Sequence, residues 1–195
     1  GEAACSGVHG AGLLVGNSLL EDVASGWNAG VEGSRIEAGF GAINESETNE
    51  EQNRIENMLR RDEGTSSAAL SYALRRAMTD GLGISRSPDG MEAAYQMVSH
   101  CRQALNDVAL YDGRKRYNQE LVRVLELGNM IEVAGAVITS AMAREESRGS
   151  HRRTDFAEVN DDKYQMNSEV SLDQGVGEVT FVSLSTNNLS RQEAK

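Results

Sequence analysis

The sequence predicts an α+β fold that is predominantly helical. Its expected order is a ligand-contacting loop and helix, a three-helix bundle, and a small irregular tail with a β-hairpin. Several long segments carry apolar residues three and four positions apart, the period of an amphipathic helix. One stretch near the carboxyl end alternates apolar and polar residues, as a half-buried strand does. The 195 residues include one proline and 20 glycines, which suits helices joined by glycine-containing loops.

Residues 1–32 are expected to form the first unit, a glycine-rich loop followed by a helix. The glycines of residues 10–16 superficially resemble a dinucleotide-binding fingerprint, but no strand precedes them. Because the chain opens in such a loop, we expect either a piece of a larger protein or one subunit of a split protein. A loop that runs into a helix N-terminus can still hold an anion or cofactor, since backbone N–H groups and the positive dipole end face the ligand. The N–H groups expected here belong to Asn17, Ser18 and Leu19.

The helix of this first unit is expected over residues 17–31. Asn17 or Ser18 is the expected N-cap, and Glu21 and Asp22 are expected in the first turn, where they favour the helix dipole. Gly30 and Gly33 are expected to end it. The residues expected on its apolar face are Leu19, Leu20, Val23 and Trp27.

Residues 65–147 are expected to form a bundle of three helices. The helices are expected from Ser66 to the glycines at 81 and 83, from Pro88 to Leu105, and from Asn118 to Glu146. The third is the most apolar and is expected at the centre of the bundle. Its Gly128 and Gly135 lie on the apolar stripe, so a neighbouring helix is expected to approach closely there.

The two remaining units are more polar. Residues 33–64 are acidic and predict a solvated connection or an exposed short helix. Residues 148–195 form the tail, in which Glu178–Ser185 alternates like a strand. Its expected partner is Glu169–Leu172, reached across an intervening glycine-containing turn.

Composition excludes several classes of function. The formal net charge is −11, which repels phosphate backbones and argues against nucleic-acid binding. No stretch approaches the roughly 20 consecutive apolar residues of a membrane span, so direct membrane insertion is not expected. The two cysteines, Cys5 and Cys101, are too few for a disulfide framework and suit a reducing compartment.

Metal-binding and nucleophilic sites are not predicted. His9, His100 and His151 are far apart in the sequence, and neither cysteine has a second cysteine nearby. No nucleophile elbow or Ser/His/Asp arrangement is found, so no catalytic residue is assigned. His100 lies on an apolar helix and is interpreted as structural, whereas the place of His9 in the glycine loop leaves both a structural and a functional role open.

A second candidate is the unusually charged run of residues 144–155. One interpretation is a helix C-terminus whose cations favour the helix dipole. The other is that Arg148 and His151 reach towards an anionic ligand or a flavin edge. The sequence leaves both open.

Taken together, these segments resemble the succinate dehydrogenase and fumarate reductase flavoprotein subunits. The segments that resemble their second flavin-binding segment are residues 1–5 (GEAAC), 8–11 (VHGA) and 16–21 (GNSLLE). Those that resemble their carboxy-terminal helical region are residues 74–78 (LRRAM), 83–84 (GI), 127–130 (LGNM), 141–151 (AMAREESRGSH), 155–156 (DF) and 161–162 (DD). L-aspartate oxidase shares this architecture, and Gly26–Trp27 is similar to it. The matches fall in order across most of the chain.

The resemblance implies the carboxy-terminal part of an FAD-dependent oxidoreductase that interconverts succinate and fumarate. The residue matching Glu2 would bind the FAD ribose, and Ser18 and Leu19, next to Asn17, would contact the isoalloxazine and the nearby phosphate region. The FAD would be shared with an N-terminal flavoprotein part or subunit, and an iron–sulfur subunit would be the electron-transfer partner. The expected location is the cytoplasm or mitochondrial matrix, peripheral to a membrane through partner subunits. The chain alone is expected to be inactive.

One departure from the family concerns the substrate. The family has Asn-Arg where this chain has Gly12 and Leu13, and its arginine clamps a substrate carboxylate. Leucine cannot form that bidentate charged pair, and leaving a buried carboxylate unpaired costs on the order of 3–5 kcal/mol. Leu13 therefore leaves three alternatives open: a different substrate, as in a paralogous flavoprotein, another cation in place of the arginine, or a catalytically weak copy. The acidic surface keeps a further alternative open, a non-catalytic helical interaction module.

Overall fold

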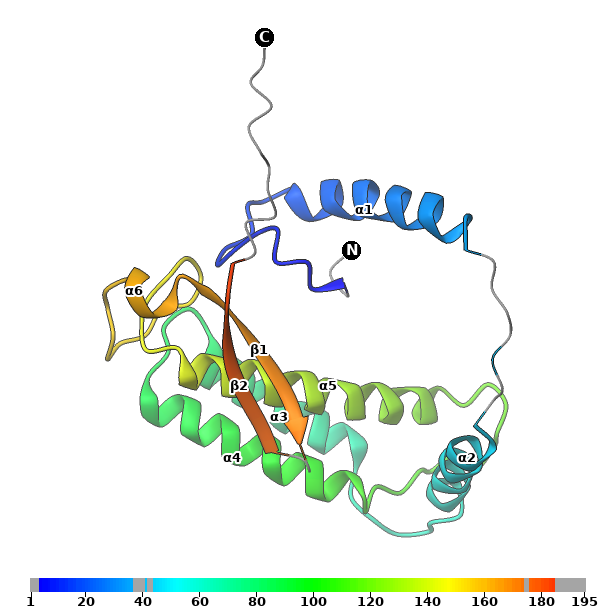
Figure 1. The fold of residues 1–195 in the computed structure, drawn as a ribbon. Helices are drawn as coiled ribbons and strands as arrows, with labels where there is room; N and C mark the ends of the chain where they lie inside the picture. Colours follow the sequence, from blue (N-terminus) through cyan, green and yellow to red (C-terminus); the bar gives the residue numbers. More distant parts are fainter. Residues whose placement is uncertain (1–3, 37–40, 42–43, 174–175, 185–195) are drawn as a thin grey trace.

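The computed structural model describes residues 4–36, 41, 44–173 and 176–184 (Figure 1). Its helices are α1 (Asn17–Gly33), α2 (Glu45–Leu59), α3 (Ser67–Leu82), α4 (Pro88–Leu105), α5 (Gln119–Ala143) and the single turn α6 (Asp161–Tyr164). Its strands are β1 (Met166–Asp173) and β2 (Val176–Ser183), which pair antiparallel. The prediction of a predominantly helical α+β fold is confirmed.

The hydrophobic core lies between α3, α4 and α5, which form the predicted three-helix bundle. Leu74 of α3, Val98 of α4 and Ile131 of α5 are each almost completely buried in one cluster. The helices begin where the sequence provides side-chain caps: Ser66, Ser87 and Asn118 each accept a backbone N–H of the first turn. Helices α3 and α4 each begin and end within about one residue of the predicted bounds.

The predicted close approach at the glycines of α5 is confirmed. A Cβ built on Gly135 would lie 2.9 Å from Nη2 of Arg102, and one on Gly128 would lie 3.4 Å from Cδ2 of Leu105. Both contacts come from α4. Arg102 completes this contact with a bidentate ion pair to Glu132 of α5, at 2.9 and 3.0 Å.

The start of α1 corrects two predictions. Its N-cap is Gly16, with φ +89°, and no side chain caps the helix, so neither Asn17 nor Ser18 has the predicted capping role. Glycine adopts this left-handed conformation at no steric cost, which lets the loop turn sharply into the helix. The first turn holds no acidic residue, because Glu21 and Asp22 lie further along the helix. The predicted apolar face exists but is uncovered within the described residues, and Figure 1 shows α1 standing apart from the bundle.

Of the two alternatives for residues 33–64, the structure has the exposed helix, α2, which is 15 residues long. Its N-cap is Asn44, whose side chain accepts the N–H groups of Ser46 and Glu47. Glu45 and Glu47 lie in the first turn, where negative charge is favourable. Most of α2 is exposed, and Met58 near its end is buried.

Helix α5 ends at Ala143, three residues before its predicted end at Glu146. Arg144 has extended backbone angles, φ −89° and ψ 99°, which end the helix. The reason is the side chain of Glu146, which is completely buried in a polar cluster beyond the helix. Apolar periodicity contains no information about that polar contact, so the predicted end at Glu146 is wrong.

The predicted hairpin is confirmed, with strands slightly displaced from their predicted bounds. Val170 of β1 pairs with Val179 of β2, and the sheet packs on α5 (Figure 1). Phe181 of β2 lies edge-on to Tyr164 of α6, with ring centroids 5.1 Å apart. Within the described residues, no helix has the length and apolar character that a membrane span requires.

Candidate functional site

A tight turn over residues 148–151 follows α5 and forms the centre of the candidate site. The N–H of Arg148 donates to the carbonyl of His151 at 2.8 Å, and the N–H of His151 donates back at 2.9 Å. Gly149 between them has φ +57°, a conformation that glycine adopts readily. These two hydrogen bonds close the turn and present Gly149 and Ser150 at its tip.

Glu146 holds the base of this turn. Its Oε1 accepts Nη1 of Arg144 at 2.7 Å and Nε of Arg148 at 2.9 Å. Its Oε2 accepts Nη2 of Arg148 at 3.0 Å and the N–H of Asn160 at 2.9 Å. Burial by itself raises the pKa of Glu146, but the hydrogen bonds from Arg148, Asn160 and Arg144 outweigh it and lower this pKa to about 2. The carboxylate is therefore charged at all ordinary pH values.

This lowered pKa predicts an acid-dependent stability. The unfolded Glu146 takes up a proton near its ordinary pKa of 4.5, whereas the folded one resists protonation down to about pH 2. Stability from this group is thus complete above pH 4.5 and is lost as the pH falls towards 2, by about 3 kcal/mol. Urea unfolding at several pH values should show this limb in the native chain and a shallower one in Glu146→Gln. Equal slopes for the two chains would contradict the assignment.

His151 is engaged on both ring nitrogens. Nη1 of Arg86 lies 2.7 Å from Nδ1, and Nε2 lies 3.0 Å from the carbonyl oxygen of Arg144. Because arginine only donates, Nδ1 accepts and Nε2 carries the proton. Burial lowers the pKa of His151, and the charges of Arg86, Arg144 and Arg153 lower it further. The ring is therefore held neutral as a link between the turn, the end of α5 and the loop that carries Arg86.

For the charged run of residues 144–155, the geometry supports the interpretation that its cations stabilise the C-terminal end of α5, and not the one in which they reach towards a ligand. Arg148 is occupied by Glu146 and by Asp161, whose Oδ1 is 2.6 Å away. Arg153 donates to the carbonyl oxygen of Met142 at 2.8 Å, at the C-terminal end of α5. Arg148 and His151 thus stabilise the turn from within the chain.

The tip of the turn contacts the glycine loop. Both the N–H and the hydroxyl of Ser150 donate to the carbonyl oxygen of Ala11, each at 2.9 Å. A Cβ on Gly149 would lie 2.3 Å from the same oxygen, so the two backbones touch. The segment that the sequence predicts to contact a cofactor therefore rests directly on the charged cluster.

The other side of the glycine loop is joined to α1 through Glu21. Nε2 of His9 lies 2.7 Å from Oε2 of Glu21, and the hydroxyl of Ser6 donates to Oε1 at 2.6 Å. The hydrogen bonds from Ser6 and His9 lower the pKa of Glu21. A groove of about 460 Å³ runs along this contact; among the side chains that line it are those of Asn17 and Asn28. His9 thus has a defined structural partner in Glu21, and a functional role for it stays a prediction.

The predicted cofactor-binding residues lie at the N-terminus of α1. The N–H of Asn17 is occupied by the carbonyl oxygen of Leu14, at 3.0 Å. No side chain caps the N–H groups of Ser18 and Leu19, which leaves them suited to a phosphate or a flavin carbonyl. Glu2 lies outside the described residues. Among the described residues of this predicted set, Ser18 and Leu19 therefore keep N–H groups that an anionic or carbonyl oxygen could accept, whereas the N–H of Asn17 is already occupied.

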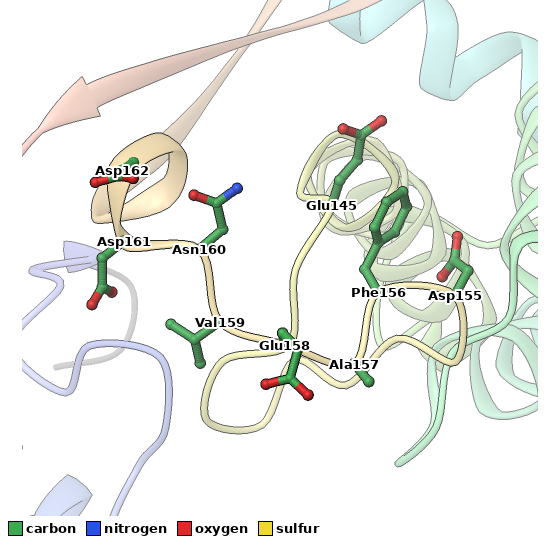
Figure 2. Close-up of a pocket in the computed structure, with 9 residues that line it drawn as sticks. All are labelled: Glu145, Asp155, Phe156, Ala157, Glu158, Val159, Asn160, Asp161 and Asp162. Atoms are coloured by element: carbon green, nitrogen blue, oxygen red, sulfur yellow. The ribbon is translucent and has the colours of Figure 1, made fainter.

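An acidic groove of about 630 Å³ lies beside the cluster (Figure 2). Figure 2 shows the carboxylates of Glu145 and Glu158 pointing in opposite directions rather than towards a common point. Glu145 is paired with Lys163 at 2.9 Å. No group of three or more possible metal-ligating residues is present in the described part of the chain. Glu145 and Glu158 are thus not placed to act together on one substrate atom.

Sequence reasoning missed three residues that build this site: Glu146, Arg86 and Ser150. For Glu146 a signal existed, because Arg144, Glu146 and Arg148 alternate and would share one side of an extended chain. For Arg86 there was none, since it meets His151 across 65 positions of sequence.

Known flavoprotein subunits are similar to this chain in sequence over most of its length. The family described as the fumarate reductase flavoprotein C-terminal region matches residues 71–194. A succinate dehydrogenase flavoprotein subunit of Rickettsia conorii is 30% identical over 177 residues, 89% of this chain and 30% of that protein. The fumarate reductase flavoprotein subunit of Escherichia coli is 33% identical over 159 residues, 80% of this chain and 26% of that protein. The chain thus spans under a third of the length of these relatives.

Solved structures agree with the sequence matches. A quinol fumarate reductase of E. coli superposes with a TM-score of 0.71 at 26% identity, over 78% of this chain and 27% of that one. The adenylylsulfate reductase of Archaeoglobus fulgidus superposes with a TM-score of 0.65 over 74% of this chain and 25% of that one. Its 17% identity establishes a common fold alone.

Proposed function

Because the chain belongs to the succinate dehydrogenase and fumarate reductase flavoprotein family, we propose that it forms the carboxy-terminal part of an FAD-dependent oxidoreductase interconverting succinate and fumarate. It supplies one wall of the FAD site and the helical region behind it. The observation that carries this proposal is the uncapped N-terminus of α1, delivered by a glycine loop that rests on the turn of residues 148–151.

In this proposal the chain positions the cofactor and stabilises charge on it. Bound FAD would supply the hydride chemistry. The N–H groups of Ser18 and Leu19, with the positive end of the α1 dipole, would face a flavin carbonyl or a phosphate oxygen. Glu2 would bind the ribose, and Asn17 would lie beside the contact. The prediction that the chain alone is inactive follows from this division of the site.

The proposed partners are the flavin-binding remainder of the flavoprotein and an iron–sulfur subunit. The uncovered face of α1 supports the first, since Leu19, Val23 and Trp27 expose most of their surface. A contiguous apolar face of this kind is typical of an interaction surface. The proposed location is the cytoplasm or mitochondrial matrix, at a membrane through partner subunits.

Two other functions are not favoured. A paralogue with a different substrate and a non-catalytic helical module would each keep the fold. However, relatives named succinate dehydrogenase and fumarate reductase flavoprotein subunits cover most of this chain at about 30% identity. The alternative of a paralogue rests on Leu13 alone, the residue at the position of the family's arginine.

The test is purification of the chain from its source with its bound polypeptides, followed by a visible spectrum and assays of succinate oxidation and fumarate reduction. We expect a flavin spectrum, an iron–sulfur protein and activity with the dicarboxylates. The isolated 195 residues, produced alone, should bind no stoichiometric flavin. A colourless single chain from the native source, without dicarboxylate activity, would overturn the proposal.

Leu13 provides a sharper test of the substrate. It is exposed on the glycine loop at the position of the family's carboxylate-binding arginine. In the assembled flavoprotein, Leu13→Arg should lower the KM for succinate roughly tenfold or more, because a guanidinium forms a strong bidentate pair with a carboxylate. Leu14→Arg is the matched control, since it adds the same charge to an adjacent exposed position. Equal KM values for the two variants would mean that no substrate carboxylate lies at residue 13.

A further inference from the structure

The contact between the glycine loop and the turn of residues 148–151 has the properties of a positioning device. Two donors of Ser150 converge on one acceptor, the carbonyl oxygen of Ala11, at 2.9 Å each. The hydroxyl thus adds a second hydrogen bond to the one from the backbone N–H, and the two together fix the position of the Ala11 carbonyl relative to the turn. Ala11 directly precedes Gly12 and Leu13, and a Cβ on Gly12 would lie 3.7 Å from the Ser150 nitrogen.

The turn is rigid enough to serve as a reference point. Its two backbone hydrogen bonds close it, and Arg148 anchors it to the fully buried Glu146. His151 anchors it further to Arg86, on the connection between α3 and α4. The tip of the turn is therefore tied to the bundle itself.

The glycine loop connects the turn to the N-terminus of α1. Within residues 9–16, Ala11 accepts the hydrogen bonds of Ser150. His9 contacts α1, with its Nε2 2.7 Å from Oε2 of Glu21. No helix or strand packs on α1 with more than minor contact among the described residues. The loop thus sets where the uncapped N–H groups of Ser18 and Leu19 stand relative to the bundle.

We propose that Ser150, supported by Gly149, is a positioning residue for the flavin site: its hydroxyl holds the glycine loop so that the α1 N-terminus faces the flavin. The proposal rests on the proposed function for its ligand, but not for its geometry. Gly149 is required because a Cβ would lie 2.3 Å from the Ala11 oxygen, a distance that no side chain tolerates. Ser150 acts through the loop and does not touch the cofactor.

The first test measures the loop without any flavin. In the 195-residue chain, Ser150→Ala should raise the amide hydrogen-exchange rates of residues 10–19 about two- to tenfold, the effect of one lost neutral hydrogen bond. The matched control is Ser147→Ala, whose hydroxyl donates to the carbonyl oxygen of Phe156 in the same region and does not contact the loop. This control should change the stability of the cluster and leave exchange in the loop unchanged. Equal loop exchange in native and Ser150→Ala chains would overturn the proposal.

The second test uses the assembled flavoprotein. There, Ser150→Ala should speed flavin dissociation about two- to tenfold and shift the flavin reduction potential, whereas Ser147→Ala should leave the potential unchanged. Gly149→Ala should release flavin still faster; if that variant fails to fold, Ser150→Ala alone decides. Faster loop exchange in an assembly that holds no flavin would retain the positioning role and reject the proposed function. Faster exchange with unchanged flavin dissociation and potential would overturn the role at the flavin site.

Discussion

Replacing Glu146 with alanine is expected to destabilise the chain by about 3–5 kcal/mol. The carboxylate is completely buried and joins two arginines and one backbone N–H. Without it, the guanidinium of Arg144, itself only 12% exposed, stays in the interior and loses the carboxylate with which it is paired in the described part of the chain. The loss exceeds that of an ordinary surface ion pair because the remaining charge has little water to replace its partner.

The measurement is urea unfolding of the 195-residue chain near pH 7. Glu145→Ala is the matched control, because its ion pair with Lys163 has both side chains about half exposed. That control should cost at most about 1 kcal/mol. If the two variants were equally stable, the interior of the cluster would be accessible to water. The double variant Arg144→Ala, Glu146→Ala should recover part of the loss, since it removes the buried cation together with its partner.

Replacing Ile131 with alanine is expected to cost about 2–5 kcal/mol. Ile131 is fully buried on α5, the helix that packs on both α3 and α4. Truncation removes buried methyl and methylene groups and leaves a cavity that three interlocked helices cannot easily close. The loss should appear as a lower unfolding midpoint with an unchanged dependence on denaturant concentration.

Val133→Ala is the control for this prediction. Val133 lies two positions away on the same helix and is 63% exposed. Its truncation should change stability by less than about 0.5 kcal/mol, because surface substitutions act weakly and alanine favours the helix. A similar loss at both positions would indicate that a partner covers the exposed side of α5 during the measurement.

The bundle could be predicted from the sequence because its determinants are local. Ser66, Ser87 and Asn118 cap their helices through residues only a few positions ahead, and the apolar period of each helix selects its buried side. The hairpin could be predicted in the same way, from the alternation of apolar and polar residues along its strand. These features require only neighbouring residues, so one sequence suffices.

The candidate site could be predicted only in part. The glycine loop and the start of α1 were identified, but the interpretation of Asn17 or Ser18 as a cap was wrong because Gly16 provides the turn. The contact of Ala11 with Ser150 joins residues 139 positions apart and was out of reach of any local pattern. The roles of Asn17, Ser18 and Leu19 towards FAD stay predictions.

The separation of Ala11 and Ser150 along the chain has a consequence for the order of folding. Helices α3, α4 and α5 follow one another in sequence and pack as neighbours, a topology of low contact order that folds quickly. The loop contact closes a segment of 139 residues, and its entropic cost is tolerable only once the intervening bundle is compact. The glycine loop therefore takes its place on the turn of residues 148–151 only after the bundle between them has formed, so this contact is among the last to form.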